Sequence, residues 1–416
     1  MNLHTQSLPV GVSLETQADV PCVCPSCGAP NMVVFYRVES VPVHSCLLIS
    51  DRNQAMTFPT GRLCLGLCEA CGFICNLSFD PRAQHYSAQY EETQGFSPRF
   101  RAFAEGLCGR LIDDYDIRGK RILEIGCGKG EFLAQICAMG DNTGIGIDPA
   151  YVPERDPSGR ASSVTFIRDF YSERYAHLEA DVICCRHTLE HIGQTLRFLR
   201  TIREAIGKRE RTLTIFEVPD TLRILREGAF WDVYYEHCSY FTPGSLARLF
   251  RAAGFDVDQL YFDFDDQYIV LTAYPVSGTQ PCPFSLEEDV SSLKDAIAGF
   301  AQTCGSSMTY WRDTVTRAFG EGRKIVLWGS GSKAVAFLTT LELNGAIACV
   351  VDINPYKHGR FLPCSGHEIV SPESLILHPP DQIIVMNPVY CDEIRQDLSQ
   401  LGVRAELLPV TSCVSA

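Results

Sequence analysis

Between residues 120 and 220, short runs of aliphatic and β-branched residues alternate with segments whose apolar residues recur at helical spacing. The runs predict strands over residues 122–125, 144–148, 166–170, 181–187 and 212–219. Helices are expected directly after the first run and over residues 195–208, and a closing hairpin is expected over residues 260–274. This alternation is typical of an α/β domain with a mostly parallel sheet, whose ligands bind at the carboxyl ends of the strands.

The first run ends in a glycine-rich stretch. Glu124 is followed by Gly126, Gly128 and Gly130 at alternate positions, and a helical pattern begins directly afterwards. Glycine lets the chain turn sharply from strand to helix, and it lets a ligand approach the backbone without an intervening Cβ. The spacing differs from the G-x-G-x-x-G loop of dinucleotide-binding domains. The stretch is therefore either a cofactor loop of another kind or a glycine turn that binds nothing.

Polar and aromatic residues at the ends of the later runs suit a nucleoside. Asp148 ends the second run, where a carboxylate accepts hydrogen bonds from both hydroxyls of a ribose. Asp169 and Phe170, in the loop part of the third run, suit an adenine amine and ring face, and His187 ends the fourth run. In this order the loop and its landmarks resemble motif I and the cofactor site of the class I S-adenosylmethionine (SAM) methyltransferases. The resemblance implies that the glycines pack against the amino-acid half of SAM.

Two Cys-x-x-Cys-Gly sequences lie ahead of this region. They contain Cys24 with Cys27, and Cys68 with Cys71. The spacing brings both sulfurs of a pair onto one ion, and four thiolates close a tetrahedral Zn²⁺ site. A closed coordination sphere indicates a structural ion rather than a catalytic one. Cysteines that stand singly in apolar runs are expected to pack as small hydrophobic residues.

The segment 79–98 is polar and aromatic and precedes an amphipathic helix predicted over residues 100–115. It carries Tyr86 and Tyr90. A segment of this composition is either a simple linker or a lid that folds over the cofactor, and the sequence leaves both open.

Residues 230–241 are dense in groups that titrate or donate hydrogen bonds, and they include Tyr234, Glu236 and His237. The stretch has neither a clean helical nor a clean strand period. Loops of this composition on the ligand side of a sheet usually hold active-site residues. The alternative is an aromatic-rich helix cap around a histidine whose hydrogen bonds are satisfied.

The chain is expected to break at residues 279–283 and to continue in a long bridging helix over residues 286–319. A second α/β unit follows, whose loop over residues 329–334 has dinucleotide spacing with alanine in the third slot, and Asp352 ends the next run. Too little chain remains for a complete doubly wound domain, so NAD(P) is not expected. The loop binds either the pyrophosphate of a substrate or nothing.

The chain has 416 residues and a formal net charge of −14, with 46% hydrophobic and 21% charged residues. The length allows two or three domains. The negative charge argues against nonspecific binding to nucleic acid and to an anionic membrane surface. No apolar run approaches the ~20 residues of a membrane-spanning helix, and the N-terminus lacks the features of a signal peptide. We therefore expect a cytoplasmic protein, monomeric or homodimeric, that acts on a small molecule.

Taken in order, the cysteine pairs, motif I, the Y-x-E-H sequence and the glycine-loop tail resemble the SAM-dependent sugar C-methyltransferases. Those enzymes methylate C3 of nucleotide-linked 4-keto-6-deoxy sugars in deoxysugar biosynthesis. The resemblance implies an α/β protein with three parts: a zinc-binding module over residues 20–80, a class I methyltransferase domain over 81–280, and a bridging helix with a Rossmann-like domain over 281–410. Residues 81–99 are the lead-in or lid of the middle part. Segments 41–44 and 90–94 differ from the well-described sugar enzymes, which leaves the sugar and its nucleotide open.

The resemblance also implies catalytic roles. His237 corresponds to the proposed base, with Glu236 and Tyr234 beside it. We expect Glu236 to orient the imidazole of His237 and Tyr234 to donate a hydrogen bond to the developing enolate oxygen. A tyrosine ahead of the SAM domain also reaches the site in that family, and Tyr90 is the best match, with Tyr86 the alternative.

The implied chemistry is consistent with these residues. A ketone acidifies the neighbouring C–H bond, so a histidine can remove the proton, and the resulting enolate attacks the methyl group of SAM. His187 and His191, at the end of the fourth run, are rival bases. Two other classes stay open: a SAM-dependent methyltransferase acting on oxygen or nitrogen, and a noncatalytic protein that binds zinc and a nucleotide sugar.

Overall fold

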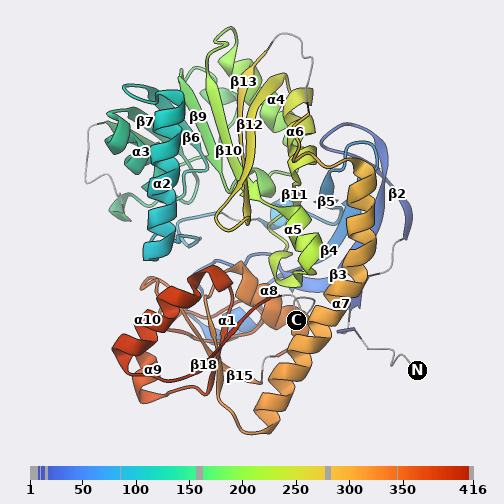
Figure 1. Ribbon diagram of the computed structural model, residues 1–416, viewed down its shortest axis with the longest axis vertical. Helices are drawn as coiled ribbons and strands as arrows, with labels where there is room; N and C mark the ends of the chain where they lie inside the picture. Colours follow the sequence, from blue (N-terminus) through green and yellow to red (C-terminus); the bar gives the residue numbers. More distant parts are fainter. Residues whose placement is uncertain are drawn as a thin grey trace.

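A computed structural model describes residues 8–9, 11–14, 17–84, 86–155, 163–276, 283–343 and 345–411 of the chain. Three β-sheets lie beside the long helix α7 (Val290–Gly320), which runs along one side of the molecule (Figure 1). The chain break expected at residues 279–283 falls almost entirely outside the described residues. Within the described part, no helix combines the length and the apolar character that crossing a membrane requires.

The central sheet has seven strands in the order β12-β13-β10-β9-β6-β7-β8, and β13 runs antiparallel to both of its neighbours. The chain places β7 and β8 on one side of β6, and β9 and β10 on the other. Such a change of direction opens a crevice at the carboxyl ends of the strands. All five predicted strands are present, and the hairpin begins earlier than expected. The bounds are β6 Arg121–Ile125, β7 Thr143–Ile147, β8 Val164–Ile167, β9 Val182–Arg186, β10 Leu213–Pro219, β12 Phe255–Asp263 and β13 Tyr268–Pro275.

Helices cover both faces of the central sheet because alternate strand residues point to opposite sides. Ile122 and Cys184 pack in one cluster with α2 and α3, whereas Leu123 and Cys185 pack in another with α4 and α6. The buried thiols confirm that these cysteines serve as small hydrophobic residues. The helices are α2 Pro98–Tyr115, α3 Glu131–Gly140, α4 Thr195–Ile206, α5 Thr221–Glu227 and α6 Pro243–Ala252.

The N-terminal sheet is completed by a strand from far along the chain. Its own strands are β1 Val12–Ser13, β2 Gln17–Val23, β3 Pro30–Pro42, β4 Thr60–Leu67 and β5 Ile74–Asn76, with α1 at Arg52–Met56. The edge strand β5 pairs with β11 (Ser239–Tyr240), with Ser239 opposite Cys75. The residues directly after His237 therefore belong to the N-terminal sheet, a pairing that the sequence did not predict.

The C-terminal sheet is fully parallel, in the order β16-β15-β14-β17-β18. The glycine loop connects β14 to α8 at the carboxyl edge. The bridging helix α7 begins at Val290, later than the expected residue 286, because the Asp289 carboxylate caps it by accepting from the Ser292 amide. The elements are β14 Ile325–Trp328, α8 Ser332–Leu341, β15 Ile347–Val351, β16 Ile369–Val370, α9 Ser374–Leu377, β17 Gln382–Val385, α10 Cys391–Leu401 and β18 Glu406–Pro409.

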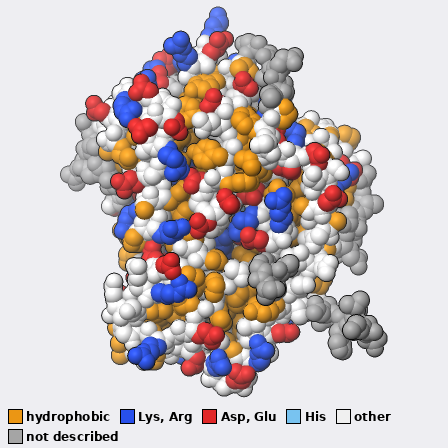
Figure 2. Space-filling view, viewed as in Figure 1, with side chains coloured by type: hydrophobic (Ala, Val, Ile, Leu, Met, Phe, Trp, Pro, Cys, Tyr) orange, Lys and Arg blue, Asp and Glu red, His pale blue; other side chains and the backbone are white. Residues whose placement is uncertain are grey.

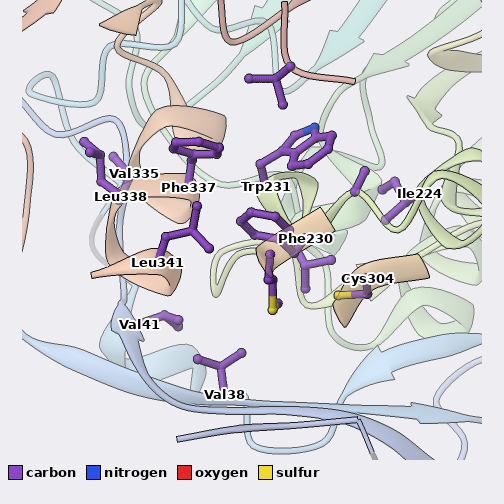
Figure 3. Packing of buried hydrophobic residues seen from close by; sticks show 14 of the residues in the cluster. Val38, Val41, Ile224, Phe230, Trp231, Cys304, Val335, Phe337, Leu338 and Leu341 are labelled. Atoms are coloured by element: carbon purple, nitrogen blue, oxygen red, sulfur yellow. The ribbon is translucent and has the colours of Figure 1, made fainter. Parts of the chain in front are cut away.

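One hydrophobic cluster joins the three parts (Figure 3). It contains Val38 of β3, Phe230 beyond α5, Cys304 of α7 and Phe337 of α8. The rings of Phe230 and Phe337 stack with their centroids 5.9 Å apart. At Gly228, a Cβ would lie 2.5 Å from the backbone nitrogen of Cys304, so α5 and α7 approach at a distance that only glycine permits. Burial of this shared surface holds the parts in a fixed arrangement.

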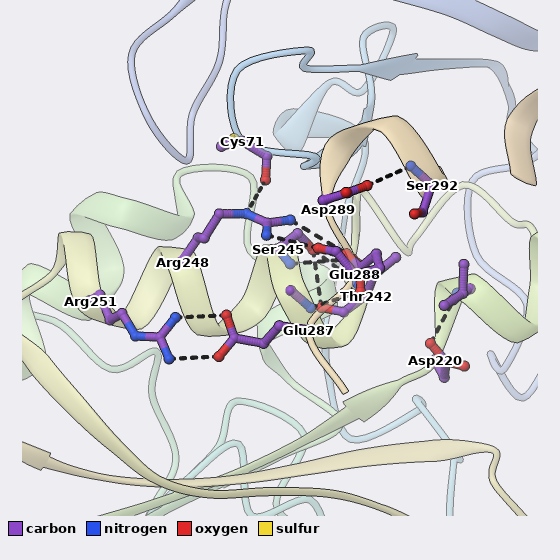
Figure 4. A network of polar contacts seen from close by, with 12 residues as sticks. Cys71, Asp220, Thr242, Ser245, Arg248, Arg251, Glu287, Glu288, Asp289 and Ser292 are labelled. Carbon is purple, nitrogen blue, oxygen red and sulfur yellow. Dashed lines mark hydrogen bonds and ion pairs between the residues drawn. The ribbon is translucent and has the colours of Figure 1, made fainter. Parts of the chain in front are cut away.

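Charged side chains add a second connection between the parts. Arg248 of α6 donates from Nε to the carbonyl of Cys71 at 2.9 Å and also contacts Glu288, while Arg251 pairs with Glu287 through two bonds of 2.6 and 2.7 Å (Figure 4). Such charge-assisted bonds are about twice as strong as neutral ones. The bond from Arg248 ties the second cysteine pair to α6. On the outside, acidic and basic side chains are interspersed over the face shown in Figure 2.

Candidate active site and metal centre

A cavity of about 1100 Å³ lies at the carboxyl end of the central sheet and extends to the C-terminal sheet. Three segments far apart in sequence line it: the loop after β6, the stretch around His237, and the loop after β14. Tyr86, Tyr90 and residues 92–97 of the lead-in also form part of its wall. Small-molecule sites usually measure ~300–1000 Å³, so this cavity has room for a cofactor together with a second ligand.

The loop after β6 has a conformation that requires its glycines. Gly126, Gly128 and Gly130 have φ of +74°, +55° and +85°. A Cβ at Gly126 would lie 1.9 Å from the Thr188 hydroxyl, and a Cβ at Gly130 would lie 2.4 Å from the Phe166 ring. Two effects exclude a side chain at these positions: the positive φ would strain any residue with a Cβ, and neighbouring side chains leave no space for one.

Glu124, at the end of β6, is 2% exposed, and its Oε2 has no hydrogen-bond partner among the described residues. Burial raises the pKa of Glu124 to about 7, although the nearby Arg186 opposes the shift. An unpaired buried carboxylate oxygen costs roughly 1–3 kcal/mol. The carboxyl group therefore stands directly before the glycine loop with one oxygen that has no hydrogen-bond partner in the described part of the chain.

The acids predicted to hold the nucleoside line the same cavity. The Asp148 carboxylate accepts from the amides of Gly128 (2.8 Å) and Ala150 (2.6 Å). The Asp169 carboxylate accepts from its neighbouring amide and from the Tyr175 hydroxyl at 2.6 Å, and the Phe170 side chain is 58% exposed. The structure brings these residues together as expected, and their contacts with ribose and adenine stay predictions.

His187 also lines the cavity, but it is held as a cation. Its Nε2 lies 2.6 Å from a carboxylate oxygen of Glu217, which also accepts from Arg186 at 2.9 Å. Burial alone would lower the pKa of His187, yet Glu217 and Glu190 raise it to about 9. Burial opposes ionisation of Glu217, but Arg186 and His187 hold its pKa at about 2. A histidine that is protonated at neutral pH cannot accept a further proton, so His187 is poorly suited to act as a base.

His237 has the opposite character. Its side chain lines the cavity and is 8% exposed, with ring centroids 4.2 Å from Tyr234 and 4.7 Å from His191. Burial, assisted by the positive charge of His191, His187 and Lys333, lowers the pKa of His237 well below its usual value. The imidazole is therefore neutral at physiological pH and has a lone pair available. Burial also raises the pKa of Tyr234 well above its usual value, so the phenol keeps a proton to donate.

The structure gives Glu236 different partners from those expected. The carboxylate, 1% exposed, lies 3.1 Å from His44 Nδ1, and it accepts from the Ser45 amide at 3.2 Å and from the Ser332 hydroxyl at 3.1 Å. Within the described residues no hydrogen bond joins it to the imidazole of His237. The expectation that Glu236 orients His237 directly is therefore wrong for this structure. Instead, Glu236 connects the N-terminal part, the central domain and α8.

The two tyrosines of the lead-in stand side by side in the cavity wall, with ring centroids 5.0 Å apart. The Tyr86 hydroxyl lies 2.8 Å from His191 Nδ1, which also faces the carbonyl of Glu236 at 2.9 Å. His191 is thus engaged by Tyr86, whereas Tyr90 makes no such bond in the described part of the chain. Both tyrosines reach the site, and the choice between them stays open.

The C-terminal glycine loop reaches the far side of the cavity. Asp352, the acid that a dinucleotide ribose would use, instead accepts from the amide of Ser330 at 2.9 Å and from its hydroxyl at 2.5 Å. Lys333 lies 2.6 Å from Asp232, which also contacts Arg223 at 3.0 Å. The loop therefore places one cationic side chain, Lys333, in the first turn of α8, where an anionic ligand is favoured, and Asp232 is its partner in this structure.

The side chains of the two Cys-x-x-Cys pairs converge on one point. All four sulfurs, of Cys24, Cys27, Cys68 and Cys71, lie within 4.8 Å of one another. Cys24 Sγ lies 3.7 Å from Cys71 Sγ, and Cys27 Sγ lies 3.6 Å from Cys68 Sγ. Tetrahedral Zn²⁺ with bonds of ~2.3 Å places its sulfurs about 3.8 Å apart. Each pair closes the same turn, in which the amide of the following glycine donates to the carbonyl of the first cysteine at 2.8 Å. The donor set therefore fits zinc.

Two protein families match the chain. Residues 99–260 match the family described as a methyltransferase domain, and residues 286–406 match the C-methyltransferase C-terminal domain. C-methyltransferase NovU of Streptomyces niveus is 26% identical over 391 residues, which cover 89% of this chain and 90% of that protein. The chain belongs to the SAM-dependent C-methyltransferases. Its enzyme class and its cofactor, SAM, follow from this membership.

Solved structures of methyltransferases are similar to part of this chain. One is 1,6-didemethyltoxoflavin-N1-methyltransferase of Burkholderia thailandensis with bound S-adenosylhomocysteine (SAH), at 18% identity and a TM-score of 0.34, covering 42% of this chain and 79% of that one. Another is magnesium protoporphyrin IX methyltransferase (ChlM) of Synechocystis with bound SAH, at 14% identity and a TM-score of 0.34, covering 42% and 84%.

Sequence reasoning missed several residues of the C-methyltransferase site. Glu217 lies inside the apolar strand β10, and no motif around it indicates a role in the site. His44 lies in segment 41–44, noted only as a departure from the sugar enzymes, although a histidine beside a buried strand end was a usable sign. Ser332 and Lys333 belong to the C-terminal glycine loop, whose spacing predicts a phosphate site but not their contacts with Glu236 and Asp232.

Proposed function

We propose that this C-methyltransferase methylates the carbon next to the ketone of a nucleotide-linked 4-keto-deoxysugar. The observation that carries the proposal is the single cavity shared by the motif I loop, His237 and the C-terminal glycine loop. One end suits the cofactor. The other end has Lys333 beside the N-terminus of α8, which suits the diphosphate of a nucleotide sugar. The sugar between them would lie against His237.

In this proposal His237 is the general base. SAM supplies the methyl group. The neutral imidazole of His237 takes the proton from the carbon next to the ketone. Tyr234, with Tyr90 or Tyr86 opposite, donates a hydrogen bond to the enolate oxygen that forms. The cavity walls hold donor and acceptor carbon in line, which supplies much of the rate enhancement in a two-substrate reaction.

We also propose that Cys24, Cys27, Cys68 and Cys71 hold one structural Zn²⁺. The ion would fix the two turns of the N-terminal part, which is too small to stabilise itself through a core alone. Through β5 and β11 this part then supports the stretch that carries His237. The segment 81–99, which contributes to the cavity wall, would act as the lid.

Two measurements on the purified enzyme test the function. The first incubates it with SAM and a panel of nucleotide-linked 4-keto sugars and locates the new methyl group by mass spectrometry and NMR. The second follows exchange of the hydrogen next to the ketone with deuterated water when SAM is absent. Wild type and His187→Gln should exchange, whereas His237→Gln should not, and its turnover should fall ~10²–10⁴-fold.

Other outcomes would redirect the proposal. Exchange that persists in His237→Gln but disappears in His187→Gln would move the base to the end of β9. Transfer of the methyl group to an oxygen or nitrogen, without any exchange of the C–H hydrogen, would exclude the enolate from the mechanism. Absence of turnover with every keto sugar, alongside tight SAH binding, would point to a different acceptor.

A further inference from the structure

A carboxylate outside motif I lies directly over the glycine loop. A Cβ at Gly128 would stand 2.7 Å from Glu92 Oε1, so a ligand that packs on this glycine also touches Glu92. The other oxygen, Oε2, is buried and has no hydrogen-bond partner in the described part of the chain. Glu92 therefore presents an unsatisfied acceptor to the position where the cofactor is expected.

Lys129 does not satisfy this carboxylate. Its Nζ lies 3.6 Å from Glu92 Oε2, beyond the ~2.7–2.9 Å of a charge-assisted hydrogen bond. The same Nζ donates to the carbonyls of Tyr90 at 2.7 Å and Ala150 at 2.9 Å, which directs two of its protons elsewhere. Burial raises the pKa of Glu92 to about 7, although Lys129 opposes the shift. A nearer cation is needed to stabilise the charged carboxylate.

Neighbouring contacts fix Glu92 in place. Glu91, 1% exposed, forms an ion pair with Arg155 and accepts from Asn354 Nδ2 at 2.8 Å. Arg155 in turn lies over the ring of Tyr356, 3.9 Å from its centroid. The lead-in is thereby fastened to the central domain and to the C-terminal domain at the residue before Glu92. A site on a segment held this firmly is preorganised for its ligand.

We propose that Glu92 binds the α-ammonium group of SAM. The glycines face the amino-acid half of the cofactor, and Asp148 is already the acceptor for the ribose. Of the two cationic groups in SAM, the ammonium donates hydrogen bonds and the sulfonium does not. A carboxylate with a free oxygen is the matching partner. This role rests on the family's use of SAM and not on the identity of the sugar.

Two ligands separate this role from its alternatives. SAH keeps the α-ammonium group, whereas 5′-methylthioadenosine has the same nucleoside and thioether but no amino-acid group. Calorimetry would measure both with wild type, Glu92→Gln and the control Asp113→Asn, which replaces an exposed carboxylate on α2 paired with Arg118. We expect Glu92→Gln to weaken SAH binding roughly ten- to hundredfold, the worth of one hydrogen bond to a charged group. Binding of 5′-methylthioadenosine should change less than about twofold, which also shows that the variant is folded.

The contrary results are distinct. If both ligands weaken equally, Glu92 serves the ribose or the loop itself, and the proposal fails. If neither weakens, Glu92 is only a distant partner of Lys129, and the proposal also fails. Inactivity toward keto sugars would not affect either measurement, so failure of the proposed sugar substrate is detected separately.

Discussion

The contacts of Glu236 yield a prediction that separates a connecting role from a catalytic one. The substitution Glu236→Gln keeps the shape of the side chain and removes its charge. Glutamine retains one acceptor oxygen, which can still take the bonds from the Ser45 amide and the Ser332 hydroxyl. Its NH₂ group then faces His44 Nδ1, where the carboxylate oxygen lay at 3.1 Å.

The magnitude follows from the three contacts of 3.1, 3.2 and 3.1 Å. A hydrogen bond to a charged group contributes ~1.5–3 kcal/mol, and a neutral one contributes ~0.5–1.5 kcal/mol. Losing the charge at a site with 1% exposure should therefore cost roughly 2–3 kcal/mol in total. The state in which the contacts of Glu236 with His44, Ser45 and Ser332 are open would then become about thirty- to hundredfold more populated, because 1.4 kcal/mol corresponds to a factor of ten.

Amide hydrogen exchange measures this opening locally. Peptides covering residues 43–48 and 330–336 should exchange about thirty- to hundredfold faster in the variant, while a peptide over β4 should not change. Glu288→Gln is the matched control, because Glu288 is also a buried acceptor but contacts Thr242 and Arg248. Burial opposes ionisation of Glu236, yet His44 lowers its pKa. A lowered pKa means that the stabilisation is present at neutral pH and is lost as the pH falls through that pKa.

Two results would refute the connecting role. Unchanged exchange over residues 43–48 would mean that the contacts contribute nothing measurable. Uniformly faster exchange in all three sheets would indicate general destabilisation. If residues 43–48 stay protected while the substrate C–H exchange of Proposed function stops, Glu236 acts on the base after all.

Three further outcomes are expected. Wild type, purified without chelator, should contain about one Zn²⁺ per chain, and Cys27→Ser should lose the ion and unfold the N-terminal part; less than about half an equivalent in wild type would contradict this. Asp148→Ala should weaken SAH binding by roughly 1–3 kcal/mol through loss of the ribose contact, and an unchanged dissociation constant would remove that role. Because the pKa of His237 is lowered, kcat/KM should stay level as the pH falls through 6.5 and decline only below it; a decline centred above 6.5 would indicate another base.

Local features of the fold were predictable because they depend on neighbouring residues. The five central strands and the glycine loop follow from apolar runs and from spacing within a few positions. The convergence of the four cysteines follows from two short motifs, each of which closes its own turn. By contrast, hairpin and helix starts were misplaced by a few residues, as with α7, where the Asp289 cap decides the first turn.

The partners of the site residues were not predictable, because tertiary contacts create them. Glu236 and His44 are 192 positions apart in the chain, and Glu236 and Ser332 are 96 apart. The adjacent position of Glu236 and His237 suggested an orienting pair, but neighbours in an irregular loop need not point the same way. The charge of His187 likewise depends on Glu217, which sits on the next strand of the sheet.

These contacts connect the N-terminal part to the stretch that carries His237. β5 pairs with β11, directly after His237, and His44 with Ser45 fixes the carboxylate directly before it. His237, the proposed base, is therefore flanked on both sides by contacts with a part whose turns the proposed zinc site would close. A central domain cut at residues 99–276 would keep the glycine loop, His237 and all seven strands of the central sheet, but it would lose these supports, the lead-in with Glu92 and the end of the cavity that carries Lys333. Such a fragment should still bind the nucleoside of SAH, yet it should not exchange the substrate C–H bond.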